Sequence, residues 1–256
     1  MVFSFDLFKE LVRTNFKLKY KGSILGFLWV LLKPFFIFLI LFAIFVNIVK
    51  GTTDMSSKEF ALYLLIGMVF FNFFNEGIIF GMNSLLDKSQ IILKVNFNRL
   101  IAVASSIALA LINFGINLII VAVVSAFVGA HITVASALYL LAVIAAMVIL
   151  IFAISLFTSI ILIRLRDLTH ITELALQLLF YASAVFIPIE SIPERFHELI
   201  LLNPIAVFIQ TARSAVMYGT IDRLDFVATA IVASTILFFL GFAFFENRVK
   251  KITEYF

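Results

Sequence analysis

The stretch YKGSILGFLW at residues 20–29, followed by Lys33-Pro34, decides the fold because it joins two different kinds of helix. The residues before it are amphipathic at helical spacing, with an apolar side (Phe5, Phe8, Val12, Phe16) and a basic side (Lys9, Arg13, Lys17). A helix of this pattern lies along a membrane surface. An apolar run long enough to cross a bilayer begins at Gly26. The sequence therefore predicts an interfacial helix over 4–20 that leads into a first span.

The composition places the whole chain in a membrane. Of 256 residues, 64% are hydrophobic and 13% are charged. In soluble domains roughly half of the residues are apolar and about a quarter are charged. Apolar runs of about 20 residues or more cover 26–49, 60–81, 100–128, 135–163, 171–189 and 226–245. We predict an all-α integral membrane protein with six transmembrane helices, in which residues 1–256 form a single domain.

The distribution of Lys and Arg predicts the orientation, because basic loops stay in the cytoplasm. The basic loops are the amino-terminal arm, the loop at 83–98, the pair Arg164 and Arg166, and the carboxyl end. Both termini are then cytoplasmic, which requires an even number of spans. The apolar stretch 199–216 contains Asn203-Pro204 and Arg213, so we interpret 191–218 as short re-entrant helices instead of a seventh span. The alternative for this stretch is an ordinary amphipathic surface helix.

The sequence lacks the motifs of several function classes. There is no G-x-x-x-x-G-K-[ST] loop to hold nucleotide phosphates. His131, His170 and His197 have no metal-ligand spacing, and the chain has no cysteine. We therefore expect no catalytic residue, metal or cofactor on this chain. The net charge of +4 follows from membrane topology, and a nucleic-acid partner is not expected.

Few ionisable residues fall inside the predicted spans, where they are functional candidates by default. Lys33 lies about two turns into the first span, although its long side chain can also reach back to the cytoplasmic surface. Glu76, near Asn72 and Asn75, is a proton carrier, a helix cap or one half of an ion pair, for which Lys33 is a plausible partner. Asn113 and Asn117, one turn apart on the third span, are expected to hydrogen-bond between helices, and the alternative is contact with the substrate.

Three blocks of sequence resemble one family. They are Y-K-x-S-x-L-G-x-L-W with its early proline, the loop at 83–98, and a series that runs from Arg166-Asp167-Leu168 through LQLLFY at 176–181 to Leu202-Asn203-Pro204. Together they resemble the permease subunit of ABC-2 type polysaccharide exporters, especially the O-antigen or lipopolysaccharide export permeases. The chain departs from the family pattern at Asn98 and Ala184, where proline is common.

The resemblance implies a homodimer in the bacterial inner membrane that binds two copies of a separate ABC ATPase. ATP and Mg²⁺ would bind to that partner, and the cargo would be an undecaprenyl-linked polysaccharide. The loop at 83–98 mixes aliphatic and basic side chains, as expected of a knob that docks on a partner, and the resemblance makes it the coupling helix; the alternative is a solvated loop. The expected coupling residues are Leu86, Asp87, Lys88, Ile91, Ile92, Lys94 and Phe97.

The resemblance also implies a path and a gate. The expected path residues are Trp29, Lys33, Phe36, Phe180 and Tyr181 on the first and fifth spans, since aromatic rings offer sugars weak contacts, and conduction needs weak contacts at several sites. The expected outer gate includes Pro193, Asn203 and Pro204.

Other functions remain open at this point. Within the family, the cargo can instead be capsule, teichoic acid or a small hydrophobic molecule. An ion-coupled secondary transporter would need midplane carboxylates or internal repeats, and a polytopic membrane enzyme would need clustered polar groups at one membrane face. Neither pattern occurs in this sequence.

Overall fold

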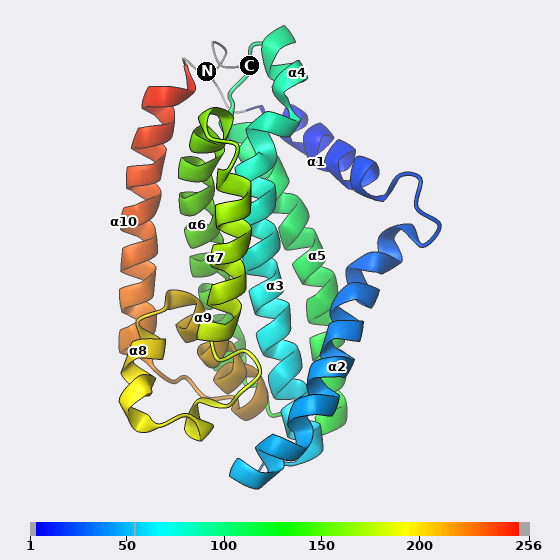
Figure 1. Cartoon of the computed structure of the whole chain (residues 1–256), viewed down its shortest axis with the longest axis vertical. Coiled ribbons are helices and arrows are strands. Elements are labelled where there is room, and N and C mark those ends of the chain that lie inside the picture. Colours follow the sequence, from blue (N-terminus) through cyan, green and yellow to red (C-terminus); the bar gives the residue numbers. More distant parts are fainter. Residues whose placement is uncertain (1–3, 54, 251–256) are drawn as a thin grey trace.

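The computed structural model describes residues 4–53 and 55–250, which form helices and no strand (Figure 1). The α-helices are α1 (Phe5–Tyr20), α2 (Trp29–Thr52), α3 (Ser57–Asp87), α4 (Ser89–Lys94), α5 (Leu100–Val128), α6 (Val134–Arg164), α7 (Leu168–Ala182), α8 (His197–Leu201), α9 (Pro204–Arg213) and α10 (Leu224–Val249). Five of them, α2, α3, α5, α6 and α10, are long and apolar enough to cross a membrane. The all-α membrane architecture predicted from the sequence is confirmed.

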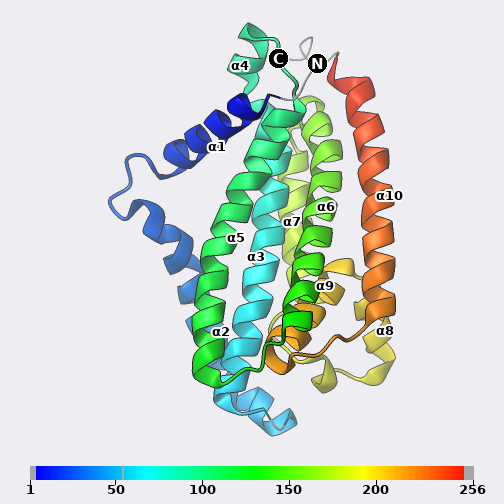
Figure 2. The ribbon, with the colours of Figure 1, turned by 180° about the vertical axis from the view of Figure 1, so that it is seen from behind.

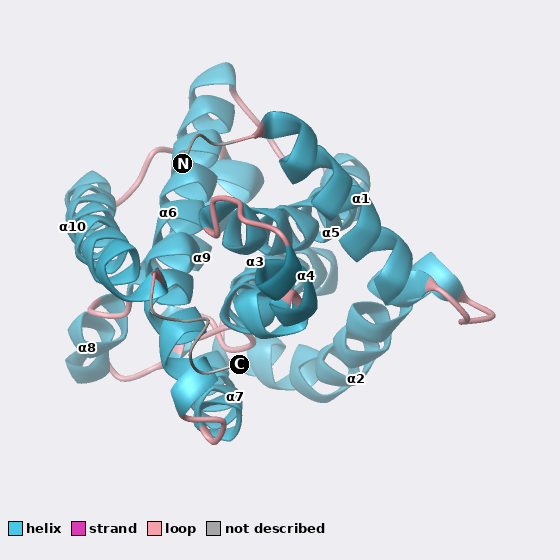
Figure 3. Ribbon diagram, turned by 90° about the horizontal axis from the view of Figure 1, so that it is seen from above, coloured by secondary structure: helices cyan, strands magenta, loops and turns pink. Residues whose placement is uncertain are grey.

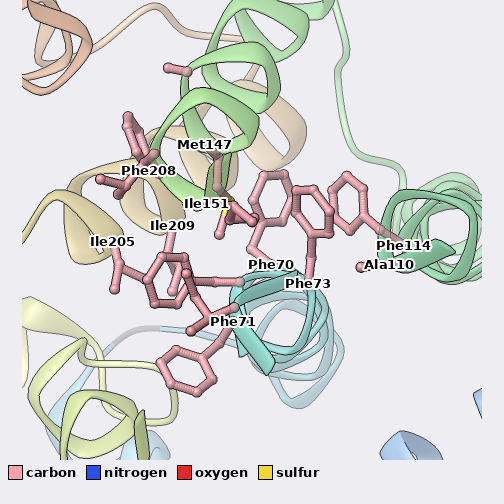
Figure 4. Packing of buried hydrophobic residues seen from close by; sticks show 14 of the residues in the cluster. Phe70, Phe71, Phe73, Ala110, Phe114, Met147, Ile151, Ile205, Phe208 and Ile209 are labelled. Atoms are coloured by element: carbon pink, nitrogen blue, oxygen red, sulfur yellow. The ribbon is translucent and has the colours of Figure 1, made fainter. Parts of the chain in front are cut away.

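Helix α3 is the centre of the bundle, and α5, α6, α2 and α9 all pack against it (Figure 3). Its apolar side chains run all round the helix, which is the pattern of a buried helix. Aromatic rings make much of the contact: Phe73 stacks on Phe114 of α5 at 4.4 Å between ring centroids, and Phe71 meets Phe180 of α7 edge to face at 5.0 Å. Figure 4 shows this packing around Phe70, Phe71 and Phe73.

Helix α1 is capped by Ser4, whose hydroxyl accepts a hydrogen bond from the Leu7 amide, and it packs on α5 at an angle to the bundle. The turn that follows is compact because Phe27 packs against both Phe16 and Tyr20, each at 5.5 Å between centroids. Gly22 and Gly26 take the positive φ values of +82° and +45° that this turn requires. The stretch at 20–29 thus fixes the angle between α1 and α2.

Helix α2 is the least packed of the long helices. Of the most apolar 18 residues in the span that contains α2, only 6% are buried, against 72% in the span that contains α3. In Figure 1 the chain leaves the bundle after α1 and returns as α2 along the outer side of α3. One face of α2 is therefore exposed in the single chain.

The fifth predicted span, 171–189, is not one continuous helix. Helix α7 ends at Ala182, and its 15 residues extend about 22 Å, less than the roughly 30 Å of a hydrocarbon core. Ala184 then adopts a φ of +50°, which no α-helix can contain. The chain instead turns into short helical segments at 189–191 and 194–196.

The segment predicted to be re-entrant forms a sharply bent pair. Residues Glu194–Leu201 and Pro204–Tyr218 meet at 105°, and counting this pair as one span would raise the number of candidate spans to six. The last turn, Ser214–Tyr218, is a π-helix. Figure 2 shows α8 and α9 at the end of the bundle opposite to α4.

The loop predicted over 83–98 is partly helical. Helix α3 continues through Asn83–Asp87, only Lys88 separates it from α4, and residues 95–98 after α4 are not helical. The start of α1, helix α4 and the end of α10 all lie at the same end of the bundle (Figure 1).

Candidate functional site

A polar pocket opens between the start of α2 and the middle of α3 and α5. It has a volume of about 110 Å³, and its polar lining comes from Lys33, Asn72, Asn75, Glu76, Asn113 and Asn117, beside Trp29 and Pro34. On α3, Asn72, Asn75 and Glu76 are three or four residues apart and thus share one face. We call this site the polar pocket.

Glu76 is held by two residues from different helices. The Asn113 side-chain amide of α5 donates to its carboxylate at 2.6 Å, and the Lys19 amine of α1 lies 3.8 Å away. The sequence suggested Lys33 as the ionic partner; the structure gives this role to Lys19 instead. Lys19 also stands 4.0 Å from the ring centroid of Phe80, a favourable position for a cation.

The asparagines predicted to join helices behave differently from each other. Asn113 connects three helices, because its Oδ1 accepts from the Tyr20 hydroxyl of α1 at 3.1 Å while its amide donates to Glu76 of α3. Asn117 donates at 2.9 Å to the carbonyl of Asn113 in its own helix, so it stabilises α5 locally. The prediction of an interhelical contact is confirmed for Asn113, and Asn117 makes its hydrogen bond within α5.

The environment of the pocket shifts two groups of α1. Burial raises the pKa of Tyr20 to about 12, and the nearby charge of Glu76 adds to this shift, so the phenol stays protonated and donates to Asn113. Burial lowers the pKa of the Lys19 amine, Glu76 opposes that shift, and the positive charge of Lys33 contributes to it. The interfacial helix is thus electrostatically linked to the polar pocket.

Three of the five expected path residues line one of two sites, and the other two are exposed on the surface. Trp29 and Lys33 line the polar pocket. Phe180 lines a separate groove between α2, α3 and α7, here called the α7 groove, with Glu173 and Gln177 of α7; Asn72 and Asn75 line both sites. Tyr181 is 60% exposed and packs against Phe180, and Phe36 is 54% exposed on α2. Sequence reasoning missed Glu173 and Gln177, although their i, i+4 spacing places them on one face of α7.

The segment from Asp87 to Phe97 divides into buried and exposed side chains. Lys88 is 5% exposed, and its amine donates to the Ser106 hydroxyl of α5 at 2.8 Å, so it anchors the segment. Ile92 and Phe97 are also buried, whereas Asp87, Ile91 and Lys94 are exposed and Leu86 is half-buried. Leu93 and Val95, which were not among the expected coupling residues, are the most exposed apolar side chains of this segment.

A cleft of about 510 Å³ lies beside this segment. It separates α1 from α3, α4 and α5, and its lining includes Leu18, Asn83, Asp87, Lys88 and Ile91. Helix α1 and the α4 segment therefore form the two walls of one opening.

At the opposite end of the bundle, the expected gate residues shape the bent helix pair. Asn203 caps α9, since its Oδ1 accepts from the Ile205 amide at 3.0 Å, and its own amide donates to Ser183 at 2.9 Å. Pro204 occupies the first position of α9, and Pro193 precedes the short helix at 194–196.

Arg213 is the central polar residue of this end, and no contact was predicted for it. It is buried, and its guanidinium donates to three carbonyls, those of Tyr63, Ala184 and Val185, at 3.1, 3.1 and 2.5 Å. Gly67 on α3 leaves room for it, because a Cβ at that position would overlap the Arg213 guanidinium. The sequence pattern that could have predicted this contact is an arginine within an apolar stretch together with a glycine on a neighbouring helix.

Charged and amide side chains enclosed by membrane-crossing helices are typical of transport proteins, because polar groups at that depth usually serve a pathway. Membrane transport protein is therefore the class that the bundle and its pockets define. The family description "ABC-2 type transporter" matches residues 6–217. The chain belongs to the ABC-2 type transporter family, whose members are membrane transport components.

The relatives of this chain match it over almost its full length. It is 27% identical over 251 residues to the O-antigen export system permease protein RfbA of Klebsiella pneumoniae, covering 98% of this chain and 95% of that protein. It is 26% identical over 249 residues to the RfbA permease protein of Myxococcus xanthus, covering 96% and 93%. It is also 26% identical over 259 residues to the polysialic acid transport protein KpsM of Escherichia coli, again covering 96% and 93%.

Proposed function

We propose that this chain is the permease subunit of an ATP-driven exporter that moves a lipid-linked polysaccharide, of O-antigen type, across the bacterial inner membrane. The observation that carries the proposal is the near-complete alignment with relatives named for O-antigen export and polysialic acid transport. Both names refer to polysaccharides, so the polymer class has better support than a drug or another small hydrophobic cargo.

In the proposed mechanism, one chain hydrolyses ATP and a different chain forms the translocation path. A separate ABC ATPase, present in two copies, binds ATP with Mg²⁺, and two copies of this permease form the path. Closure of the ATPases moves α4. The movement also reaches the interfacial helix α1, which forms the opposite wall of the cleft beside α4. The supporting contacts are the Lys88 anchor on α5 and the links from α1 to Glu76 and Asn113.

In this proposal the movement opens a route along α2 and α7. Trp29, Lys33, Phe36, Phe180 and Tyr181 are the proposed path residues. At the far end the route passes the bent pair α8 and α9, where Pro193, Asn203 and Pro204 shape the proposed gate.

The test is recovery of the ATPase. The chain is tagged at its carboxyl end, extracted gently from native membranes, and its co-purifying proteins are identified. We expect a P-loop ATPase with the unchanged chain and at least tenfold less of it with the double variant Ile91→Ser and Leu93→Ser, since both side chains are exposed on α4.

The matched control is Val134→Ser, which removes an exposed apolar side chain from the start of α6, at the other end of the bundle. It should recover the ATPase like the unchanged chain. A folded oligomer that brings down no ATPase in any form would refute the assignment to an ATP-driven exporter, and equal recovery by the α4 variant would refute its coupling role.

A further inference from the structure

The charges around the polar pocket do not balance. Glu76 is the one carboxylate among its lining residues, and it is already engaged by Asn113 at 2.6 Å and by Lys19 at 3.8 Å. Lys33 is a second cation close enough to act on Lys19 electrostatically. Two ammonium groups and one carboxylate leave one positive charge without a counter-ion, and such a charge is costly at membrane depth.

Several side-chain hydrogen-bond donors that line the pocket also have no acceptor in the part of the chain that the structure describes. Within the described residues, the side chains of Lys33, Asn72 and Asn75 make no hydrogen bond or ion pair, although all three line the pocket. By contrast, Asn113 and Asn117 both donate to protein oxygens. The pocket therefore presents one ammonium and two side-chain amides to whatever enters it.

We propose that the polar pocket binds the phosphoryl group of an anionic amphiphile. A phosphoryl group supplies the missing negative charge and several acceptor oxygens for these donors. Lys33 lies two turns into the first span, beside the middle of α3 and α5, so a bound phosphoryl group would lie inside the membrane-crossing part of the bundle. The exposed apolar face of α2, including Phe36 and Ile40, continues from the pocket and suits the hydrocarbon tail. That this amphiphile is the lipid-linked cargo rests on the proposed function; the anion site itself rests on the pocket.

The chain contains its own reporter for this site. Trp29 is its single tryptophan and lines the pocket, so intrinsic fluorescence monitors occupancy directly. The full chain in phosphatidylcholine nanodiscs is titrated with farnesyl diphosphate, with farnesol, and with inorganic pyrophosphate. We expect farnesyl diphosphate to change the Trp29 emission saturably and farnesol, which has the same tail without the anion, to bind at least tenfold more weakly.

Two substitutions should shift this affinity in opposite directions. Lys33→Gln removes the unpaired cation and should weaken farnesyl diphosphate binding about tenfold or more, while Lys33→Arg should retain it. Glu76→Gln removes the pocket's negative charge and should strengthen binding. Lys21→Gln, an exposed cation outside the pocket, is the matched control and should change nothing. A loss of folding cannot produce one weaker and one tighter variant.

Competition by pyrophosphate identifies the source of the anion. If pyrophosphate displaces farnesyl diphosphate, the phosphoryl group alone is recognised; if it does not, the group is recognised only on an amphiphile, and either result supports the site. Equal affinity for farnesol, or unchanged binding by Lys33→Gln, would overturn it and leave Lys33 as a lysine that reaches back to the surface. This binding needs neither an ATPase nor a polysaccharide, so its failure is distinguishable from failure of the exporter assignment.

Discussion

Arg213 shows how one charged residue can organise an apolar region. Its guanidinium lies 3.4 Å from the ring centroid of Tyr63, and its three carbonyl acceptors come from α3 and from the turn after α7. Buried charge is tolerated only when it is paired or fully hydrogen-bonded. Each of the three guanidinium nitrogens makes one of these bonds, and the bonds fix the position of the non-helical segment at Ala184 and Val185.

At this scale, Gly67→Ala should destabilise the protein. The new Cβ would overlap the Arg213 guanidinium and lie 2.9 Å from the Val185 carbonyl oxygen, so we expect a loss of about 1–3 kcal/mol and a lower Tm. Gly115→Ala is the matched control, because it lies within α5 and nothing stands within 4 Å of its Cβ. It should leave the Tm unchanged or raise it. Thermal unfolding in detergent compares the two, and equal Tm values would contradict the Arg213 packing.

Among the elements, the bounds of a helix were predicted best where a local residue in the sequence ends the helix. Helix α5 has the bounds 100–128 of its apolar run, because Gly129 follows with a φ of +77° and ends it. Helix α7 was predicted too long, because the residues up to 189 are apolar but their backbone is bent by tertiary contacts. The carbonyls of Ala184 and Val185 point to Arg213, some 30 residues later in the chain, and no local pattern records that contact.

The same logic explains the partial prediction of the candidate sites. Glu76 and its neighbouring asparagines stood out because polar residues are rare in apolar runs, and the structure places them in the polar pocket. The partner Lys19 was missed, because the angle of α1 brings it back to α3 only after the turn at 20–29 has formed. For α4, periodicity could not separate the buried Lys88 from the exposed Leu93.

Also at the element scale, Ala184→Pro should be strongly destabilising. Proline fixes φ near −65°, whereas residue 184 has a φ of +50°, so the turn after α7 would have to rebuild and release the Arg213 contact. We expect a loss of about 2 kcal/mol or more. Ala184→Gly, which permits the positive φ, should stay within about 1 kcal/mol of the unchanged chain. Thermal unfolding again provides the measurement, and a stable Ala184→Pro variant would show that the fold does not require the positive φ at residue 184.

For the whole molecule, the arrangement of the ends decides between an even and an odd number of membrane crossings. Helices α4 and α10 reach the same end of the bundle, and the bent pair α8 and α9 occupies the other (Figure 2). A chain that turns back at the bent pair keeps both ends on one side. Helix α7 already carries the chain from the α4 end toward α9 (Figure 1). If 194–218 crossed the membrane in addition to α7, the carboxyl end and the α4 segment would lie on opposite sides.

The absence of cysteine from the sequence makes this topology directly measurable. Single cysteines are placed at the exposed positions Gln90 and Asn247 at one end, and at Lys58 and Glu194 at the other. With the basic end in the cytoplasm, an impermeant maleimide should label Gln90→Cys and Asn247→Cys only in inside-out vesicles, and Lys58→Cys and Glu194→Cys only in right-side-out vesicles. Asn247→Cys and Gln90→Cys reacting from opposite sides would establish an odd number of crossings. Because Gln90 and Asn247 are compared within one preparation, the result depends on no assumption about vesicle purity, and it tests the re-entrant character of α8 and α9 independently of any transport assay.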